Sequence, residues 1–165
     1  MKNIEKKSRR EFIINLIKPS HYDDQGYVIQ WRRSFVPSNT LGCVLALVED
    51  VKTRNALGDD VDLVVNAYDE INIVIPTQKI ISQIKDAGGN GLIMMIGVQS
   101  NQFPRTIDLT QKFRSAGIQV AIGGFHVSGC IAMLPKLPTD IQALLDDGVM
   151  PTMSKKLYAQ TGHKV

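Results

Sequence analysis

The sequence predicts a doubly wound α/β domain, because short apolar runs alternate with helix-like segments and glycine or proline turns separate them. The strand-like runs cover residues 11–18, 61–68, 92–96 and 118–122. The segments between them are long enough for crossover helices, which connect parallel strands with a right-handed turn. We therefore expect a flavodoxin-like or Rossmann-like parallel sheet with helices on both faces. The expected strand order is 2-1-3-4, with the switch point between strands one and three.

The first strand ends at Pro19, and a long polar and aromatic segment follows it to residue 39. Ser38 is a typical helix N-cap residue. After it, apolar residues recur at helical spacing and form one apolar stripe: Leu41, Val44, Leu45, Val48 and Val51. Cys43 lies among them and is expected to be a small buried hydrophobe.

Proline and glycine mark the other helices. Pro76 opens the second helix, a position where proline is tolerated. Pro104 precedes the third helix, and Gly117 caps its end. The strand at 92–96 is the most apolar and should lie inside the sheet. A last helix is expected over residues 139–147.

The composition indicates a single soluble domain over residues 11–149, with a basic tail at 1–10 and a polar tail at 150–165. The two tails carry net charges of +4 and +3, so the body of the domain carries −4. A basic surface on the fold, which nucleic-acid binding requires, is not expected. No apolar run has the length of a membrane span or a signal-peptide core, which predicts a cytoplasmic protein with no membrane partner.

In an open α/β sheet, ligands bind outside the carboxyl ends of the strands. Gly123 and Gly124 directly follow the fourth strand, where backbone without Cβ atoms lets a flat ligand approach. The predicted topology brings this turn together with the ends of strands one and three and the start of the first helix. The candidate binding residues there are Ser20, His21, Ser38, Asn39, Gly97, Val98, Gln99, Ser100, Gly123, Gly124, Phe125 and His126.

Several common occupants of this fold are excluded by their motifs. The chain lacks the G-x-G-x-x-G turn after strand one, the phosphate-binding P-loop, the acidic cluster of a receiver domain and the G-x-S-x-G elbow. Cys43 and Cys130 are too far apart in sequence to build an iron–sulfur or zinc site unaided. The candidate site therefore predicts binding, with no catalytic residue and no metal ligand.

Three segments carry a family resemblance: residues 35–41 (FVPSNTL), 97–105 (GVQSNQFPR) and 122–129 (IGGFHVSG). Together they resemble the N-terminal cobalamin-binding domain of cobalamin-dependent radical S-adenosylmethionine proteins, over about residues 11–149. The resemblance implies a corrin ring across the carboxyl edge and a nucleotide tail that passes Gly97 and the Gly123-Gly124 pair. It also implies contacts from Ser38, Asn39, Gln99 and Ser100 to the phosphate and the propionamides.

Two departures from the family pattern limit what the resemblance implies. Many cobalamin-binding domains carry a D-x-H-x-x-G motif after the first strand, and its histidine ligates cobalt. In this chain Pro19 replaces the aspartate two residues before His21, and Asp24 replaces the glycine three residues after it. We therefore expect base-off cobalamin without a histidine ligand. The chain also lacks the C-x-x-x-C-x-x-C motif, which binds the iron–sulfur cluster of the radical core. An iron–sulfur cluster and S-adenosylmethionine would thus belong to a radical catalytic domain, on a longer chain or a separate one.

Two other functions stay open from the sequence. One is an α/β domain that binds a nucleotide or S-adenosylmethionine at the same edge, and the other is a domain for structure or partner docking without a ligand. His126 is either a contact to the ligand or a structural hydrogen-bonding residue.

Overall fold

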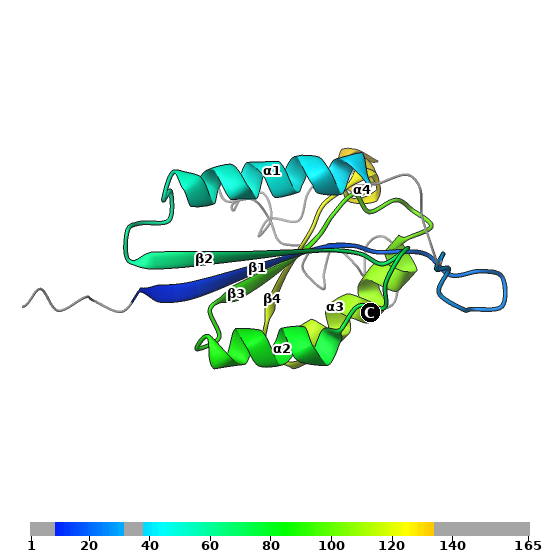
Figure 1. Ribbon diagram of the computed structural model, residues 1–165. Coiled ribbons are helices and arrows are strands. Elements are labelled where there is room, and N and C mark those ends of the chain that lie inside the picture. Colours follow the sequence, from blue (N-terminus) through cyan, green and yellow to red (C-terminus); the bar gives the residue numbers. More distant parts are fainter. Residues whose placement is uncertain (1–8, 32–37, 134–165) are drawn as a thin grey trace, which may run out of the picture.

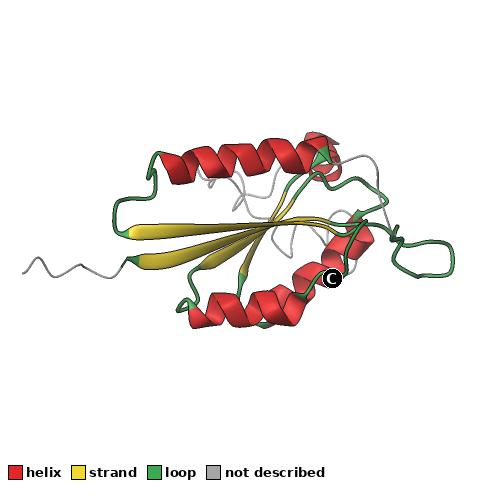
Figure 2. Ribbon diagram, viewed as in Figure 1, coloured by secondary structure: helices red, strands yellow, loops and turns green. Residues whose placement is uncertain are grey.

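The computed structural model describes residues 9–31 and 38–133. Their four strands form one parallel sheet of order β2-β1-β3-β4, which confirms the predicted topology and its Rossmann-like or flavodoxin-like arrangement. The elements are β1 (Arg10–Lys18), α1 (Asn39–Thr53), β2 (Val61–Asp69), α2 (Thr77–Asp86), β3 (Gly91–Met95), α3 (Phe103–Ser115), β4 (Gln119–Ile122) and α4 (Phe125–Met133). Helices α1 and α4 lie over one face of the sheet, and α2 and α3 over the other (Figures 1 and 2).

Strand β1 lies inside the sheet and pairs in parallel with β2 on one side and β3 on the other. Ile13, Ile14, Asn15, Leu16 and Ile17 are all buried. A continuous buried run is what a strand covered by helices on both faces requires. β3 is also an inner strand, as its apolar composition predicted.

Two apolar clusters fill the space between the sheet and the helices. One lies against α2 and α3 and includes Ile13 and Ile17 of β1. The other lies against α1 and includes Ile14 and Leu16. Because successive side chains of a strand point to opposite faces, one strand supplies both clusters.

Three of the predicted helix ends are confirmed, whereas Pro104 lies in the first turn of α3 and does not precede the helix. The Ser38 hydroxyl accepts a hydrogen bond from the Leu41 amide at 3.3 Å, so it caps α1. Pro76 is the residue before the first residue of α2. Gly117 follows α3 with a φ of 83°, a conformation that glycine adopts without a steric penalty.

The prediction that Cys43 is buried was wrong, because this cysteine is exposed. An α-helix turns by about 100° per residue. Cys43 precedes Val44 directly, so it points away from the apolar stripe toward solvent.

Helix α4 was not predicted. The apolar residues of this segment are spread around the whole helix and form no periodic stripe. Gly129 in its middle also lowers its helix propensity. The expected helix at 139–147 and the tail at 150–165 lie outside the described residues, as do residues 1–8 of the basic tail.

Candidate functional site

The turns that leave β3 and β4 are joined by backbone hydrogen bonds. Val98 donates its amide to the Gly123 carbonyl at 3.0 Å and accepts from the His126 amide at 3.1 Å. Gly123 in turn donates to the Met95 carbonyl at 2.9 Å. The structure thus brings Gly97, Val98, Gly123, Gly124 and His126 together, as the predicted topology required.

The three glycines of this edge have different uses. A Cβ atom on Gly124 would lie 2.2 Å from the Val98 nitrogen, so its missing side chain allows two backbone segments to touch. A Cβ on Gly97 would lie 3.2 Å from the Thr40 methyl group. A Cβ on Gly123 would meet no atom within 4 Å. Gly123, rather than Gly124, therefore presents open backbone to a ligand.

His126 is held on the same edge by three neighbours. Its Nδ1 lies 3.2 Å from the Ser100 hydroxyl, and its Nε2 lies 3.7 Å from the Cys130 sulfur. Its ring also packs against Phe103, with ring centroids 4.0 Å apart and ring planes tilted by 40°. These contacts fix the orientation of the imidazole beside the open Gly123 backbone.

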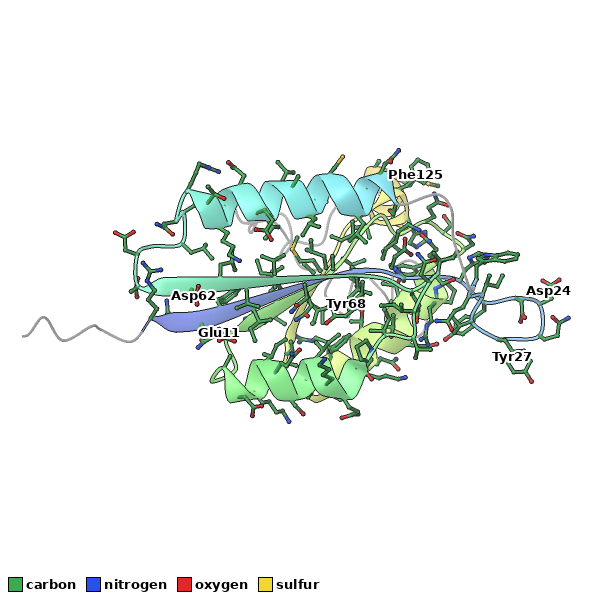
Figure 3. All side chains as sticks on the ribbon, in the orientation of Figure 1. Glu11, Asp24, Tyr27, Asp62, Tyr68 and Phe125 are labelled. Atoms are coloured by element: carbon green, nitrogen blue, oxygen red, sulfur yellow. The ribbon has the colours of Figure 1, made fainter. Side chains whose placement is uncertain are left out.

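The remaining candidates around Gly123 are accessible. Phe125 is 78% exposed, and Figure 3 shows it on the outside of the molecule, at the start of α4. The side chains of Gln99, Ser100 and Asn39 are exposed as well. The site therefore offers one aromatic surface and several amide and hydroxyl groups.

The N-terminus of α1 lies beside this edge, since Thr40 packs on Gly97. Ser38 uses its hydroxyl for the Leu41 amide. The first amides of a helix carry partial positive charge and lack partners within the helix, so this end is suited to an anionic group.

The residues after β1 are tied into the protein interior. Ser20 is 1% exposed and donates its amide to Glu70 Oε2 at 3.0 Å. Its hydroxyl donates to the Ile29 carbonyl. His21 is half-buried, and its carbonyl accepts from the Ile29 amide at 2.9 Å. Ser20 therefore supports the loop, and its amide and hydroxyl already have protein partners.

A buried ion pair, which was not predicted, holds this loop in place. Glu70 is 0% exposed, and the Arg105 guanidinium binds both of its carboxylate oxygens at 2.6–3.2 Å. Arg105 also donates to the Tyr22 hydroxyl at 3.3 Å. Burial lowers the pKa of Arg105, but the hydrogen bonds to Glu70 and Tyr22 outweigh it and raise the pKa above its usual value.

The Tyr22 hydroxyl donates in turn to Asp108 on α3. Burial raises the pKa of Tyr22, and this hydrogen bond raises it further. The loop after β1 is thus held both by Glu70, the residue that follows β2, and by α3.

Gln102 connects the turns after β1 and β3. Its Nε2 donates to the Pro19 carbonyl at 2.9 Å, and its Oε1 accepts from the Gln99 amide at 3.0 Å. Gln102 and Glu70 are both buried. A signal for Glu70 was present in the sequence, since two acidic residues, Asp69 and Glu70, follow the predicted strand at 61–68.

Two grooves, of about 310 and 510 Å³, lie at the opposite end of the strands and contain none of the candidate residues. Within residues 9–31 and 38–133, no group of three or more His, Cys, Asp and Glu side chains is placed to hold a metal ion. None of the described helices has the length and apolar character needed to span a membrane.

Comparisons with protein families, with curated proteins and with solved structures found no match.

Proposed function

We propose that this chain binds cobalamin across the carboxyl edge of its sheet and holds it for a radical S-adenosylmethionine catalytic domain. The observation that carries the proposal is the open backbone at Gly123, where a Cβ would meet no atom within 4 Å. Phe125, Gln99 and Ser100, on the turns of the same edge, are exposed. A flat ring with polar substituents matches this combination of open backbone, aromatic surface and amides.

In this proposal each group has a distinct role. Gly123 and Phe125 receive the corrin ring, and Gln99, Ser100 and Asn39 hydrogen-bond its amide side chains. The N-terminus of α1 receives the phosphate of the nucleotide tail. Bound cobalamin supplies a cobalt centre for the chemistry of the catalytic partner. The described residues contribute binding and orientation.

The direct test is retention of hydroxocobalamin during gel filtration. We expect the unmodified protein to keep the corrin absorbance and Gly123→Leu to lose it, because the added side chain fills the space that the ring would occupy. Circular dichroism should show an unchanged fold in that variant. Ala46→Leu adds the same side chain to a solvent-facing position of α1 and should retain cobalamin. A colourless unmodified protein, or retention by Gly123→Leu, would contradict the proposal.

Thermal unfolding distinguishes the other two functions. A ligand that binds only the native state stabilises it, by about 2.7 kcal/mol at a concentration of 100 times its Kd. We expect cobalamins to raise the melting temperature. Stabilisation by adenosine nucleotides or S-adenosylmethionine instead would indicate a nucleotide-binding domain, and stabilisation by neither class would favour a docking role.

We also expect bound cobalamin to be base-off, without a protein histidine on cobalt. His21 lacks the preceding carboxylate that would orient it as a ligand. Both ring nitrogens of His126 already contact protein groups, the Ser100 hydroxyl and the Cys130 sulfur. Electron paramagnetic resonance of the cobalt(II) form should therefore show no nitrogen superhyperfine splitting. Splitting that disappears in His21→Ala or His126→Ala would identify that residue as a ligand and refute the expectation.

A further inference from the structure

Helix α4 places a histidine and a cysteine on the same side of the helix, one turn apart. His126 lies in the first turn and Cys130 four residues later, a spacing that brings two side chains of a helix together. The Cys130 sulfur lies 3.7 Å from His126 Nε2, within the reach of a hydrogen bond to sulfur. A thiol next to an imidazole is an arrangement in which a base activates a nucleophile.

Two neighbours from outside α4 hold the imidazole in this position. Ser100, in the turn after β3, has its hydroxyl oxygen 3.2 Å from His126 Nδ1. Phe103 of α3 is fully buried, and its ring packs against the imidazole. When Ser100 accepts a hydrogen bond from Nδ1–H, the lone pair of Nε2 faces the thiol. The histidine is thus a base whose orientation is set by a third group.

The thiol of Cys130 is open to small molecules. It is half-buried, whereas the other described cysteine, Cys43 on α1, is exposed. The preceding residue is Gly129, and a Cβ there would meet no atom within 4 Å. Apart from the imidazole, α4 carries no ionisable side chain other than the thiol itself. Partial burial therefore favours a small reagent, and α4 does not select it by charge.

The groups present match thiol–disulfide exchange. This reaction requires an accessible sulfur and a thiol that can lose its proton, and the cysteine and histidine of α4 provide both. It needs no metal ion and no donors for an oxyanion, in contrast to acyl transfer by a cysteine nucleophile. A small disulfide is therefore the electrophile that these groups suit best.

We propose that Cys130 is a nucleophilic thiol that forms mixed disulfides with small organic disulfides, with His126 as its base and Ser100 as a positioning residue. Nε2 takes the thiol proton while the cysteine sulfur attacks one sulfur of the reagent. The reagent's own S–S bond breaks as the mixed disulfide forms, and the small thiolate that leaves takes the proton from the imidazolium. The reagent is the oxidant and is reduced to a thiol. The reaction requires no cobalamin.

The test is the rate of mixed-disulfide formation with 2-hydroxyethyl disulfide, an uncharged probe, measured by mass spectrometry of the cysteine-containing peptides. Cys43 and Cys130 are compared in the same sample of the full chain at one near-neutral pH. A positioned base contributes about 10²–10⁴-fold, and partial burial offsets some of it. We therefore expect Cys130 to react at least about tenfold faster than Cys43. An equal or lower rate at Cys130, as exposure alone would give, would overturn the proposal.

His126→Gln tests the base directly, because glutamine keeps a hydrogen-bonding side chain but cannot take the proton. We expect the rate at Cys130 to fall at least about tenfold and the rate at Cys43 to stay the same. Damage to α4 cannot imitate this result, since loosening the helix would expose Cys130 and speed its reaction. An unchanged or higher rate at Cys130 would refute the role of His126.

Ser100→Ala tests the positioning role, because the imidazole loses the hydroxyl at Nδ1. The rate at Cys130 should fall, by less than in His126→Gln, with no change at Cys43. Ser128→Ala is the matched control, since it removes an exposed hydroxyl from α4 itself, and neither rate should change. Equal rates at Cys130 in the two serine variants would show that Ser100 does not position the base.

Discussion

Replacing Gly124 with alanine is expected to lower the free energy of unfolding by about 3 kcal/mol or more, from overpacking and backbone strain together. The new Cβ would lie 2.2 Å from the Val98 nitrogen and 2.6 Å from its oxygen. Both are backbone atoms held by hydrogen bonds, so they cannot turn aside as a side chain does. The φ of Gly124 is also 144°, which side-chain-bearing residues rarely adopt. Urea unfolding followed by circular dichroism measures the effect.

Gly123→Ala is the matched control for this prediction. The Cβ would enter open space, and Gly123 is not among the glycines with positive φ. We expect a change of no more than about 0.5 kcal/mol. Similar stabilities for the two variants would show that the contact between Gly124 and Val98 is not needed for packing.

Arg105→Met is expected to destabilise the fold by about 3–5 kcal/mol, because it leaves a buried carboxylate without its counterion. Glu70 is fully buried and receives both the guanidinium and the Ser20 amide. The loss should also loosen the loop from Ser20 to Tyr22, which hydrogen exchange of the Ser20 amide would detect. Thermal and urea unfolding provide the stability.

Two further variants separate the loss of the buried ion pair from the general effect of removing an arginine. Arg54→Met removes the exposed pair with Asp50 and should cost less than about 1 kcal/mol. Glu70→Met combined with Arg105→Met removes both buried charges and should recover part of the loss. The recovery stays partial because the Ser20 amide loses its acceptor. An Arg105→Met protein as stable as Arg54→Met would refute the structural role of the pair.

The strands and the first three helices were predictable because local pattern and burial agree there. Four apolar runs and the proline and glycine turns between them specify a parallel sheet almost without reference to tertiary contacts. Helix α4 escaped prediction because its segment has no apolar stripe and contains Gly129. The burial of Cys43 was mispredicted because the residue is adjacent to Val44 of the apolar stripe in sequence. The rotation of an α-helix between two successive residues places it on the solvent side of α1.

The position of the candidate site was predictable from the sequence, but most of its contacts were not. Topology alone predicted that the turns at Gly97 and Gly123 would meet. The ion pair between Glu70 and Arg105 depends on two side chains 35 residues apart, and no local pattern connects them. The different uses of Gly123 and Gly124 depend on how close the Val98 backbone comes, which only the folded structure specifies.

The parallel register of β1 has a consequence for how the chain is made. Each β1 residue pairs with a β2 residue far along the sequence, as Asn15 and Asn66 do at a separation of 51. At about 5–20 residues per second, the ribosome adds that length in roughly 3–10 seconds. During this interval β1, which ends up inside the sheet, has neither of its neighbours, since β3 emerges later still. We therefore expect the nascent β1 segment to be the part of this protein that chaperones bind and that aggregates first when translation stalls before Val61.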